Sequence, residues 1–292
     1  MSNYRYTIII PHKNIPMLLQ RMLDTIPLRD DLQVIIVDDN SDPQVVDFNM
    51  FPGVERPNTE VYFTKEGRGA GYARNVGLLY AKGVWIIFAD ADDMYATEHL
   101  SCLLDNADDS YDAIYFFCKR KYSEDAEELI NYGMEVENNL QSIHREDILW
   151  GRVNQSWRRM VKKCIIDKND LRFKEQPVVN DIYFTKMYST FIESYAMFTS
   201  YVYCYESRSD SLIHRKNKES LVCRVNTYIW EAQFLKEIGK YEYRDNKVYI
   251  EHLRRLVKTY PVYVFYTFWK EMISVGWKES VSDHLQMLKK FY

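Results

Sequence analysis

The sequence lacks a long hydrophobic run, a secretion signal and an excess of positive charge. No apolar stretch approaches the ~20 residues that a membrane-spanning helix requires, and residues 1–6 lack the basic start and hydrophobic segment of a signal peptide. The formal net charge of −4 gives no overall attraction to nucleic acid or to anionic lipid. These absences argue against a nucleic-acid partner and favour a cytoplasmic location.

Cysteine is also scarce and unpatterned. The five cysteines are widely spaced, form no CxxC pair and have no histidine at the offsets of a zinc site, so we expect free thiols. With 47% hydrophobic and 27% charged residues, the composition is ordinary for a folded protein with one large core or two smaller ones.

Runs rich in valine and isoleucine alternate with helical patterns over the first 120 residues. Strands are expected at YTIIIP (6–11), LQVIIVDD (32–39), VYFTK (61–65), VWIIFAD (84–90) and YDAIYFF (111–117). Residues 15–26 and 69–83, which lie between strands, carry apolar side chains on one helical face. The alternation predicts an α/β fold with a doubly wound, mainly parallel sheet.

After about residue 215 the pattern becomes helical. Residues 227–241 and 246–273 have the apolar spacing of helices, with Pro261 as a break or kink. We therefore expect a helical C-terminal extension over residues 216–292.

Acidic residues follow two of the predicted strands. WIIFADADDMY (85–95) and VIIVDDNSD (34–42) both turn from apolar to acidic at the strand end. Because the carboxyl ends of parallel strands meet where ligands bind, the two clusters are expected to line one crevice.

The first of these clusters is a candidate metal site. Asp90 and Asp92 are two residues apart, so on extended chain they can face one cation, and their oxygens suit Mg²⁺ or Mn²⁺. The alternative is an ordinary helix start, with Asp93 or Thr97 near its cap.

Five pieces, taken in order, resemble the family 2 nucleotide-sugar glycosyltransferases, which have the GT-A fold. They are TIIIPHKN, VIIVDDNSD, GAGYARNVGL, IIFADADD and FKEQPVVNDIYF. The resemblance covers roughly residues 4 to 215. It implies a GT-A-type, Rossmann-like catalytic domain at 1–215, with a nucleotide-sugar half at about 1–118 and an acceptor half at about 119–215.

The resemblance also implies a donor site. The nucleobase and ribose map onto Pro11 and Asp39, the arginine of the ARN segment onto Arg74, and the acids that hold ribose and metal onto Asp90 and Asp92. In the first loop, PHKN carries a lysine where the family commonly has an aromatic residue.

The remaining motif residues concern the acceptor and the closing loop. The general base of the family maps onto Asp181, where Asn180 replaces the usual first acid. Trp157 maps onto the acceptor side. Arg208 maps onto a loop that closes over the diphosphate, and His214 in that loop is a candidate third metal contact.

The implied reaction is transfer of a sugar from a nucleotide-diphosphate sugar, such as a UDP-sugar, to a hydroxyl of a lipid-linked or polysaccharide glycan. A divalent ion, Mn²⁺ or Mg²⁺, and Arg74 would stabilise the departing diphosphate. Asp181 would take the acceptor's proton, and direct attack from the opposite face would invert the anomeric centre.

Other functions share parts of the pattern. VIIVDDNS resembles the acidic pair of a phosphoacceptor signalling domain, but a strand and a helix precede it and the chain has no Lys-Pro dipeptide. A dinucleotide-binding oxidoreductase needs a third glycine where Tyr72 stands. A sugar nucleotidyltransferase usually has a glycine-rich basic loop after the first strand, which PHKNIP is not. A non-catalytic relative that only binds nucleotide or protein stays an alternative.

The end of the chain leaves two partners open. Residues 254–273 mix four basic residues with tyrosine, phenylalanine and tryptophan, a composition compatible with resting on the inner face of a membrane. Packing against the catalytic domain or a second subunit, as in a homodimer, accounts for the same composition.

Overall fold

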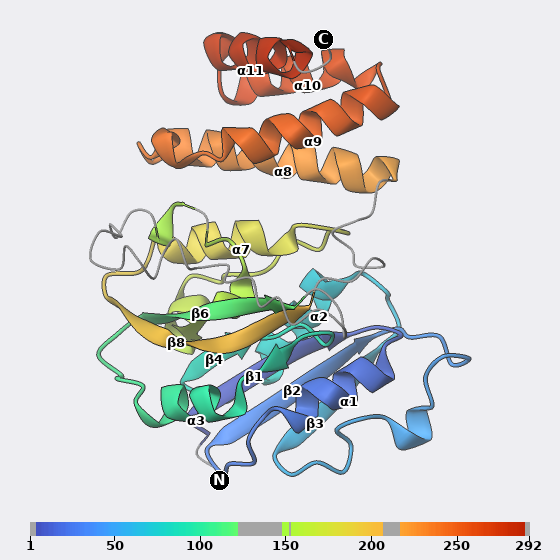
Figure 1. Cartoon of the computed structure of the whole chain (residues 1–292), viewed down its shortest axis with the longest axis vertical. Helices are drawn as coiled ribbons and strands as arrows, with labels where there is room; N and C mark the ends of the chain where they lie inside the picture. Colours follow the sequence, from blue (N-terminus) through green and yellow to red (C-terminus); the bar gives the residue numbers. More distant parts are fainter. Residues whose placement is uncertain (1–3, 122–147, 152, 207–216, 290–292) are drawn as a thin grey trace.

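The computed structural model describes residues 4–121, 148–151, 153–206 and 217–289 (Figure 1). Its centre is a sheet of eight strands in the order β3-β2-β1-β4-β7-β6-β8-β5. The strands are β1 (Tyr6–His12), β2 (Leu32–Asp39), β3 (Thr59–Thr64), β4 (Trp85–Phe88), β5 (Met94–Tyr95), β6 (Ala113–Lys121), β7 (Arg159–Lys162) and β8 (Tyr195–Glu206).

The first four strands along the sheet run parallel. β1 pairs with β2 so that Ile8 lies beside Val34, and with β4 so that Ile8 lies beside Ile87, while β2 pairs with β3. β7 is antiparallel to β4 and β6, whereas β8 is parallel to β6 and antiparallel to β5. The predicted α/β fold with a mainly parallel sheet is confirmed, with the antiparallel β7 near its middle.

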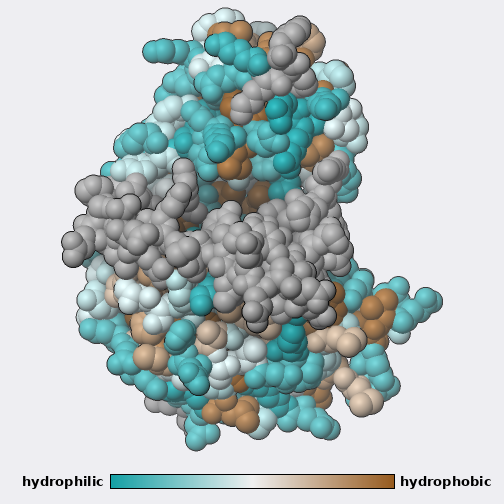
Figure 2. All heavy atoms as spheres, in the orientation of Figure 1, coloured by the Kyte–Doolittle hydropathy of each residue, from teal (hydrophilic) through white to brown (hydrophobic). Residues whose placement is uncertain are grey.

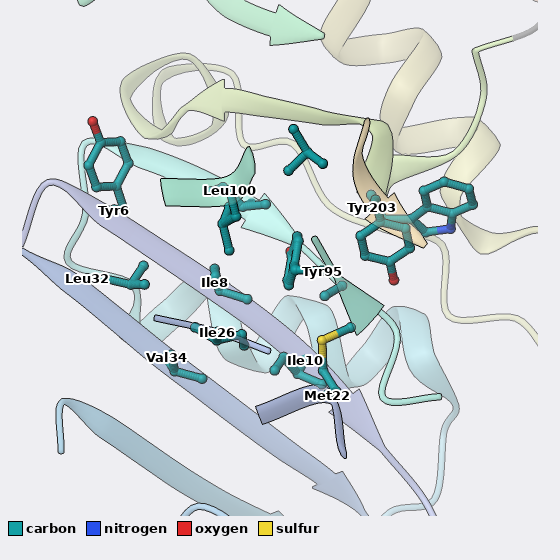
Figure 3. Packing of buried hydrophobic residues seen from close by; sticks show 14 of the residues in the cluster. Tyr6, Ile8, Ile10, Met22, Ile26, Leu32, Val34, Tyr95, Leu100 and Tyr203 are labelled. Carbon is teal, nitrogen blue, oxygen red and sulfur yellow. The ribbon is translucent and has the colours of Figure 1, made fainter. Parts of the chain in front are cut away.

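Helices cover both faces of the sheet. They are α1 (Pro16–Asp24), α2 (Ala70–Tyr80), α3 (Thr97–Asp105), α6 (Lys163–Lys168) and α7 (Asn180–Ser189), with short 3-10 turns at Phe48–Met50 and Ser156–Arg158. On the face of α1 and α3, Ile8, Ile10 and Val34 pack with Met22 and Ile26 (Figure 3). A second core joins the opposite face to α2, α6 and α7. Strands such as β1 are therefore buried at every position, because helices cover both of their faces.

The C-terminal helices form a third core of their own. They are α8 (Lys218–Glu237), α9 (Asn246–Thr259), α10 (Tyr263–Ser274) and α11 (Trp277–Lys289), with a 3-10 turn at Tyr241–Tyr243. Pro261 lies between α9 and α10, which confirms the predicted break. In Figure 1 they stack above the sheet, α8 nearest to α7 and α10 and α11 farthest from the sheet. Within the described ranges, no helix combines the length and apolarity needed to cross a bilayer.

A buried ion pair fastens α8 to α7. The Lys186 ammonium lies 3.2 Å from a Glu231 carboxylate oxygen, and the two side chains are 1% and 2% exposed. Lys186 also donates to the carbonyl oxygens of Trp150 and Gly151. Burial lowers the pKa of Lys186 and raises that of Glu231.

Figure 2 shows hydrophobic side chains at the border of the helical stack that faces the rest of the chain.

Candidate active site

The ends of β1, β2 and β4 lie at one edge of the sheet, and the starts of α2 and α7 face that edge. The two acidic clusters of the sequence follow β2 and β4, so they come to the same side of the molecule.

A buried histidine joins the first two loops. His12 Nδ1 lies 2.7 Å from Asp38 Oδ2, and its Nε2 accepts from the Ile15 amide at 3.2 Å. An Nε2 that accepts cannot carry a proton, so the arrangement selects the neutral tautomer with hydrogen on Nδ1. Burial alone would raise the pKa of Asp38, but hydrogen bonds from His12 and Ser41 hold it below its ordinary value. Pro11, one residue earlier, is buried within β1 beside Val37.

Asp39 anchors the glycine-containing loop before α2. Its side chain is 3% exposed, and its two oxygens accept from the amides of Arg68 at 3.0 Å and Gly69 at 2.7 Å. The Lys13 ammonium lies 3.7 Å from the same carboxylate. Gly71 fits because a Cβ there would lie 2.3 Å from the Lys174 carbonyl oxygen. The loop is therefore held in place from both β2 and the segment before α7.

Arg74 connects the end of β4 to the start of α7. Its guanidinium donates to Asn180 Oδ1 at 2.7 Å and to Asp90 Oδ1, and it lies over the Phe173 ring at 5.3 Å. Arg74 is 5% exposed, whereas the Asp90 side chain keeps 31% of its surface open. Asn180 supplies a neutral acceptor, so within the residues that the structure describes Asp90 is the carboxylate that forms an ion pair with Arg74.

The third acid after β4 has a structural role. Asp93 is 1% exposed and accepts from the Tyr203 hydroxyl at 2.7 Å and the Glu206 amide at 2.9 Å. The same hydroxyl accepts from the Asp90 amide at 2.8 Å. Burial, together with the charges of Asp92 and Asp90, raises the pKa of Asp93. Tyr203 (Figure 3) thus fixes the backbone from which Asp90 and Asp92 project.

The alternative that Asp93 or Thr97 caps the following helix is wrong. The cap position of α3 is Ala96, and no side chain bonds to the first turn. The Asp93 carboxylate is engaged by β8 instead.

The donor set at this edge fits a divalent ion only if the substrate completes it. The described residues contain no group of three or more histidine, cysteine or acidic side chains placed to hold a metal. Mg²⁺ and Mn²⁺ sites often use one or two carboxylates together with phosphate oxygens and water. Asp90 and Asp92 fit that requirement.

Asp181 lies in the first turn of α7, just after a residue with unusual backbone geometry. Val179 has φ 51°, a left-handed conformation that β-branched residues rarely adopt. Val179 is also the cap residue and no side chain caps the helix, so Asp181 lies in the first turn without being its N-cap. Burial raises the pKa of Asp181 to about 6, with Arg74 lowering it and Asp90 raising it.

Trp157 is 9% exposed and stacks on two tyrosines. Its ring lies 4.7 Å from that of Tyr203 and 5.8 Å from that of Tyr205, nearly parallel to both. Its acceptor role stays a prediction. Arg208 and His214 lie outside the described residues.

The sequence reasoning missed His12 and Tyr203. His12 stands at a strand end beside the motif aspartates, and that position was the available signal. Tyr203 gave none, because its partner Asp93 is 110 residues away and the strand around it holds four tyrosines.

Comparison with known proteins agrees with this geometry. The family model described as glycosyl transferase family 2 matches residues 7–171. EpsH of Bacillus subtilis (strain 168) is 24% identical over 228 residues, which are 73% of this chain and 63% of the relative. The GalNAc(5)-diNAcBac-PP-undecaprenol beta-1,3-glucosyltransferase of Campylobacter jejuni is 27% identical over 178 residues, 59% of this chain and 55% of the relative. The chain thus spans less than two thirds of the length of these relatives.

Solved structures share the fold at low sequence identity. The crystal structure of S. aureus TarS 1-349 in complex with UDP-GlcNAc has a TM-score of 0.58 at 16% identity, over 97% of this chain and 81% of that one. The mannosyltransferase PcManGT from Pyrobaculum calidifontis, in complex with GDP-Man and Mn²⁺, has a TM-score of 0.57 at 16% identity, over 96% and 73%. With a GT-A fold and a family model that matches more than half of its length, the chain belongs to glycosyl transferase family 2.

Proposed function

We propose that the chain transfers a sugar from a nucleotide-diphosphate sugar to a hydroxyl group of a glycan, with inversion at the anomeric carbon. The observation that carries the proposal is the meeting of Asp181, Arg74 and Asp90 at one strand edge. Asp181, whose pKa is about 6, lies near Arg74, and the Arg74 guanidinium can bind a diphosphate. Two further carboxylates can bind a cation that the diphosphate also contacts.

The donor site is proposed to use Pro11, Asp39 and Arg74 from the described residues and Arg208 from the later loop. Each Asp39 oxygen accepts one amide and keeps a second lone pair, so the carboxylate can still accept from a nucleobase or ribose. Lys13 lies beside it and adds positive charge where a nucleotide would lie. The nucleotide in the TarS complex is UDP-linked, which supports a UDP-sugar as the first donor to test.

A divalent ion, Mn²⁺ or Mg²⁺, is proposed to be held by Asp90 and Asp92, with His214 as a further candidate ligand. When bound, such an ion would neutralise charge that develops on the diphosphate. The Mn²⁺ in the PcManGT complex supports this proposal. Arg74 contributes to the same neutralisation from a fixed position, because Asn180 and Phe173 hold its guanidinium.

Asp181 is proposed to accept the proton of the attacking hydroxyl. A carboxylate with a pKa near 6 is mostly ionised at neutral pH, yet it is a stronger base than an ordinary aspartate. Arg74 and Arg159 lower its pKa and so favour the ionised form, while burial opposes it.

The acceptor is proposed to be a lipid-linked or polysaccharide glycan, with Trp157 on its side of the site. Two relatives support this class by their names: the Campylobacter jejuni undecaprenol-linked glucosyltransferase and the minor teichoic acid biosynthesis protein GgaB of Bacillus subtilis (strain 168), which is 32% identical over 96 residues, 32% of this chain and 11% of the relative.

We further propose residues 1–215 as the catalytic domain and 216–292 as an accessory extension that contacts a membrane surface. Val262, Phe265, Trp269 and Ile273 lie at helical spacing and are each more than half exposed. Liposome flotation of the chain and of a Phe265→Ser/Trp269→Ser variant tests the contact. Flotation that the substitutions do not reduce would contradict it, and a change from dimer to monomer in light scattering would favour a homodimer contact instead.

Release of UDP from a panel of UDP-sugars, with and without acceptor glycans, tests the proposed reaction. Calorimetry of UDP binding in EDTA and in Mn²⁺ tests the metal. We expect binding to be weak in EDTA and to lose its metal dependence in Asp92→Ala. Equal affinity in the two buffers would remove the metal from the proposal.

A further inference from the structure

A groove runs along α8 between the catalytic domain and α10. It encloses about 760 Å³, and its wall is one face of α8 together with the segment before α7 and part of α10. On α8 it extends from Lys218 to Gln233, a distance of about 20 Å at the rise of an α-helix. The length suits a chain of several units better than a single sugar.

The groove is positively charged in a protein of negative net charge. Three lysines line it, Lys174, Lys218 and Lys270, against one acid, Glu219. None of the three lysines forms an ion pair in the part of the chain that the structure describes. Instead, the Lys270 ammonium donates to Asn226 Oδ1 at 2.9 Å. An anion in the groove would therefore meet cations that no described carboxylate neutralises.

Aromatic rings alternate with these cations. The ammonium of Lys174 lies 5.5 Å from the Trp230 ring, and that of Lys218 lies 5.3 Å from the Tyr263 ring. Aromatic faces pack well against the apolar C–H surface of sugars and polyols. Because these ammonium groups lie over the ring faces, an uncharged unit beside the anion would contact the ring edges next to the charge.

One end of the groove adjoins the segment that carries Asp181. Gln176 lines the groove, and its side-chain amide donates to the carbonyl oxygens of Val178 and Val179 at 3.0 Å. Tyr183, two residues beyond Asp181, lies 4.7 Å from the Trp230 ring. A ligand that occupies the groove therefore approaches the start of α7.

We propose that this groove binds the acceptor, and that the acceptor is a glycan or polyol chain carrying phosphodiester groups. Its phosphates lie against Lys174, Lys218 and Lys270, its uncharged units lie on Trp230 and Tyr263, and its terminal hydroxyl reaches Asp181. This inference rests on the proposed transfer reaction, since it names the acceptor of that reaction.

Fluorescence anisotropy with two probes tests the groove: a short poly(glycerol phosphate) oligomer and a neutral maltodextrin of similar length. We expect the full chain to bind the phosphate oligomer more tightly than the neutral one. A Lys218→Gln/Lys270→Gln variant should bind it at least about tenfold more weakly, because hydrogen bonds to charged groups contribute on this order. The control variant Lys247→Gln/Lys278→Gln removes the same charge from exposed positions outside the groove and should bind like wild type. Circular dichroism and thermal melting verify that each variant folds.

Equal affinity of wild type and the groove variant, or equal affinity for the two probes, would overturn the proposal. Lysine-dependent binding to phosphatidylglycerol vesicles without binding of the oligomer would also overturn it in favour of a lipid headgroup. Calorimetry of UDP-sugar binding to the wild-type chain separates the two levels of inference. If no donor binds but the oligomer binds through the lysines, the proposed transfer reaction is contradicted and the proposed binding in the groove is not. If the donor binds and the oligomer does not, only the proposal for the groove is contradicted.

Discussion

Two regions of the molecule place carboxylates around an arginine, and they differ in what they leave open. In the C-terminal helices, Arg244 pairs with Glu271 at 2.7 Å and Asp283 at 2.6 Å, and Tyr249 donates to Glu271 at 2.9 Å. All three charged side chains there are at most 3% exposed. At the strand edge, the Arg74 side chain is also largely buried, at 6% exposed, but its partner Asp90 is 31% exposed.

The difference separates a closed cluster from one that leaves a carboxylate open to a ligand. In the helices, the charged side chains contact one another and are buried, so no surface remains for a ligand. At the strand edge, one acid faces outward, a neutral Asn180 replaces a second acid, and Asp181 lies close enough to Arg74 for the guanidinium to lower the pKa of Asp181. A perturbed pKa occurs in both regions, so it identifies neither as an active site by itself.

The largest expected effect is on sugar transfer. Asp181→Asn keeps the shape of the side chain but cannot accept a proton, so transfer should fall by the ~10² to 10⁴ fold that a positioned base contributes. Donor binding and melting temperature should stay close to wild type. Glu271→Gln, the same chemical change in the helical cluster, should transfer at near the wild-type rate. Near-wild-type transfer by Asp181→Asn would show that the base is elsewhere, with Glu175 the next residue to test.

Next in size is the effect of removing each arginine on stability. Arg244→Met leaves Glu271 and Asp283 buried without their partner, and breaking such a pair typically costs about 3–5 kcal/mol of unfolding free energy. Arg74→Met should cost less, because Asp90 can be hydrated, but it should abolish tight donor binding. Urea unfolding and UDP calorimetry on both variants measure this contrast. If the two variants lost similar amounts of unfolding free energy, the exposure of the carboxylate partners would not distinguish the two clusters.

The pH dependence of transfer should report the ionisation of Asp181 at the strand edge. The pKa of Asp181 is raised to about 6, and the base must be ionised, so kcat/KM should be constant above that pH and fall by about tenfold per pH unit well below it. Measuring kcat/KM between pH 4.5 and 8 tests whether the rate falls in this way at low pH. A profile that stays flat down to pH 5 would exclude a base with this pKa.

The smallest expected effect is on the pH dependence of folding stability. Stability should fall as the pH rises, whereas the rate of transfer should increase with pH. Burial raises the pKa of Glu271 to about 7 from 4.5, so the folded state binds more protons than the unfolded state between these values. The contribution of Glu271 to stability is then complete below pH 4.5 and is lost as the pH rises through 7, on the order of 1–3 kcal/mol. Glu271→Gln should remove this slope when melting is measured from pH 5 to 8. An unchanged slope would assign the pH dependence to other groups.

Much of the fold was predictable because it depends on local patterns. The strands expected over 6–11 and 32–39 are present as β1 and β2, and both are buried at every position. β5, β7 and β8 were not predicted. A two-residue strand such as Met94–Tyr95 exists only through pairing with β8 more than 100 residues later.

The residues that meet at the strand edge could be named from the sequence, but their contacts could not. Arg74 and Asp90 meet as the motif order suggested. From the sequence, Asn180 was interpreted only as a departure from the family pattern. In the structure, its side-chain oxygen accepts a hydrogen bond from Arg74. Such contacts join residues 106 positions apart, and no local pattern specifies them.

Gln176 has a consequence for engineering. Besides holding the backbone before Asp181, its side-chain amide donates to Thr227 of α8 at 3.1 Å. The C-terminal helices are thereby attached to the loop that leads into α7, the helix that carries the proposed base Asp181. A chimera that exchanged the extension at residue 216 for that of a relative would change the support of Asp181 as well as the proposed acceptor groove. Specificity and turnover would then alter together, and a designer who wanted to change one alone would have to carry the pair Gln176 and Thr227 across the junction.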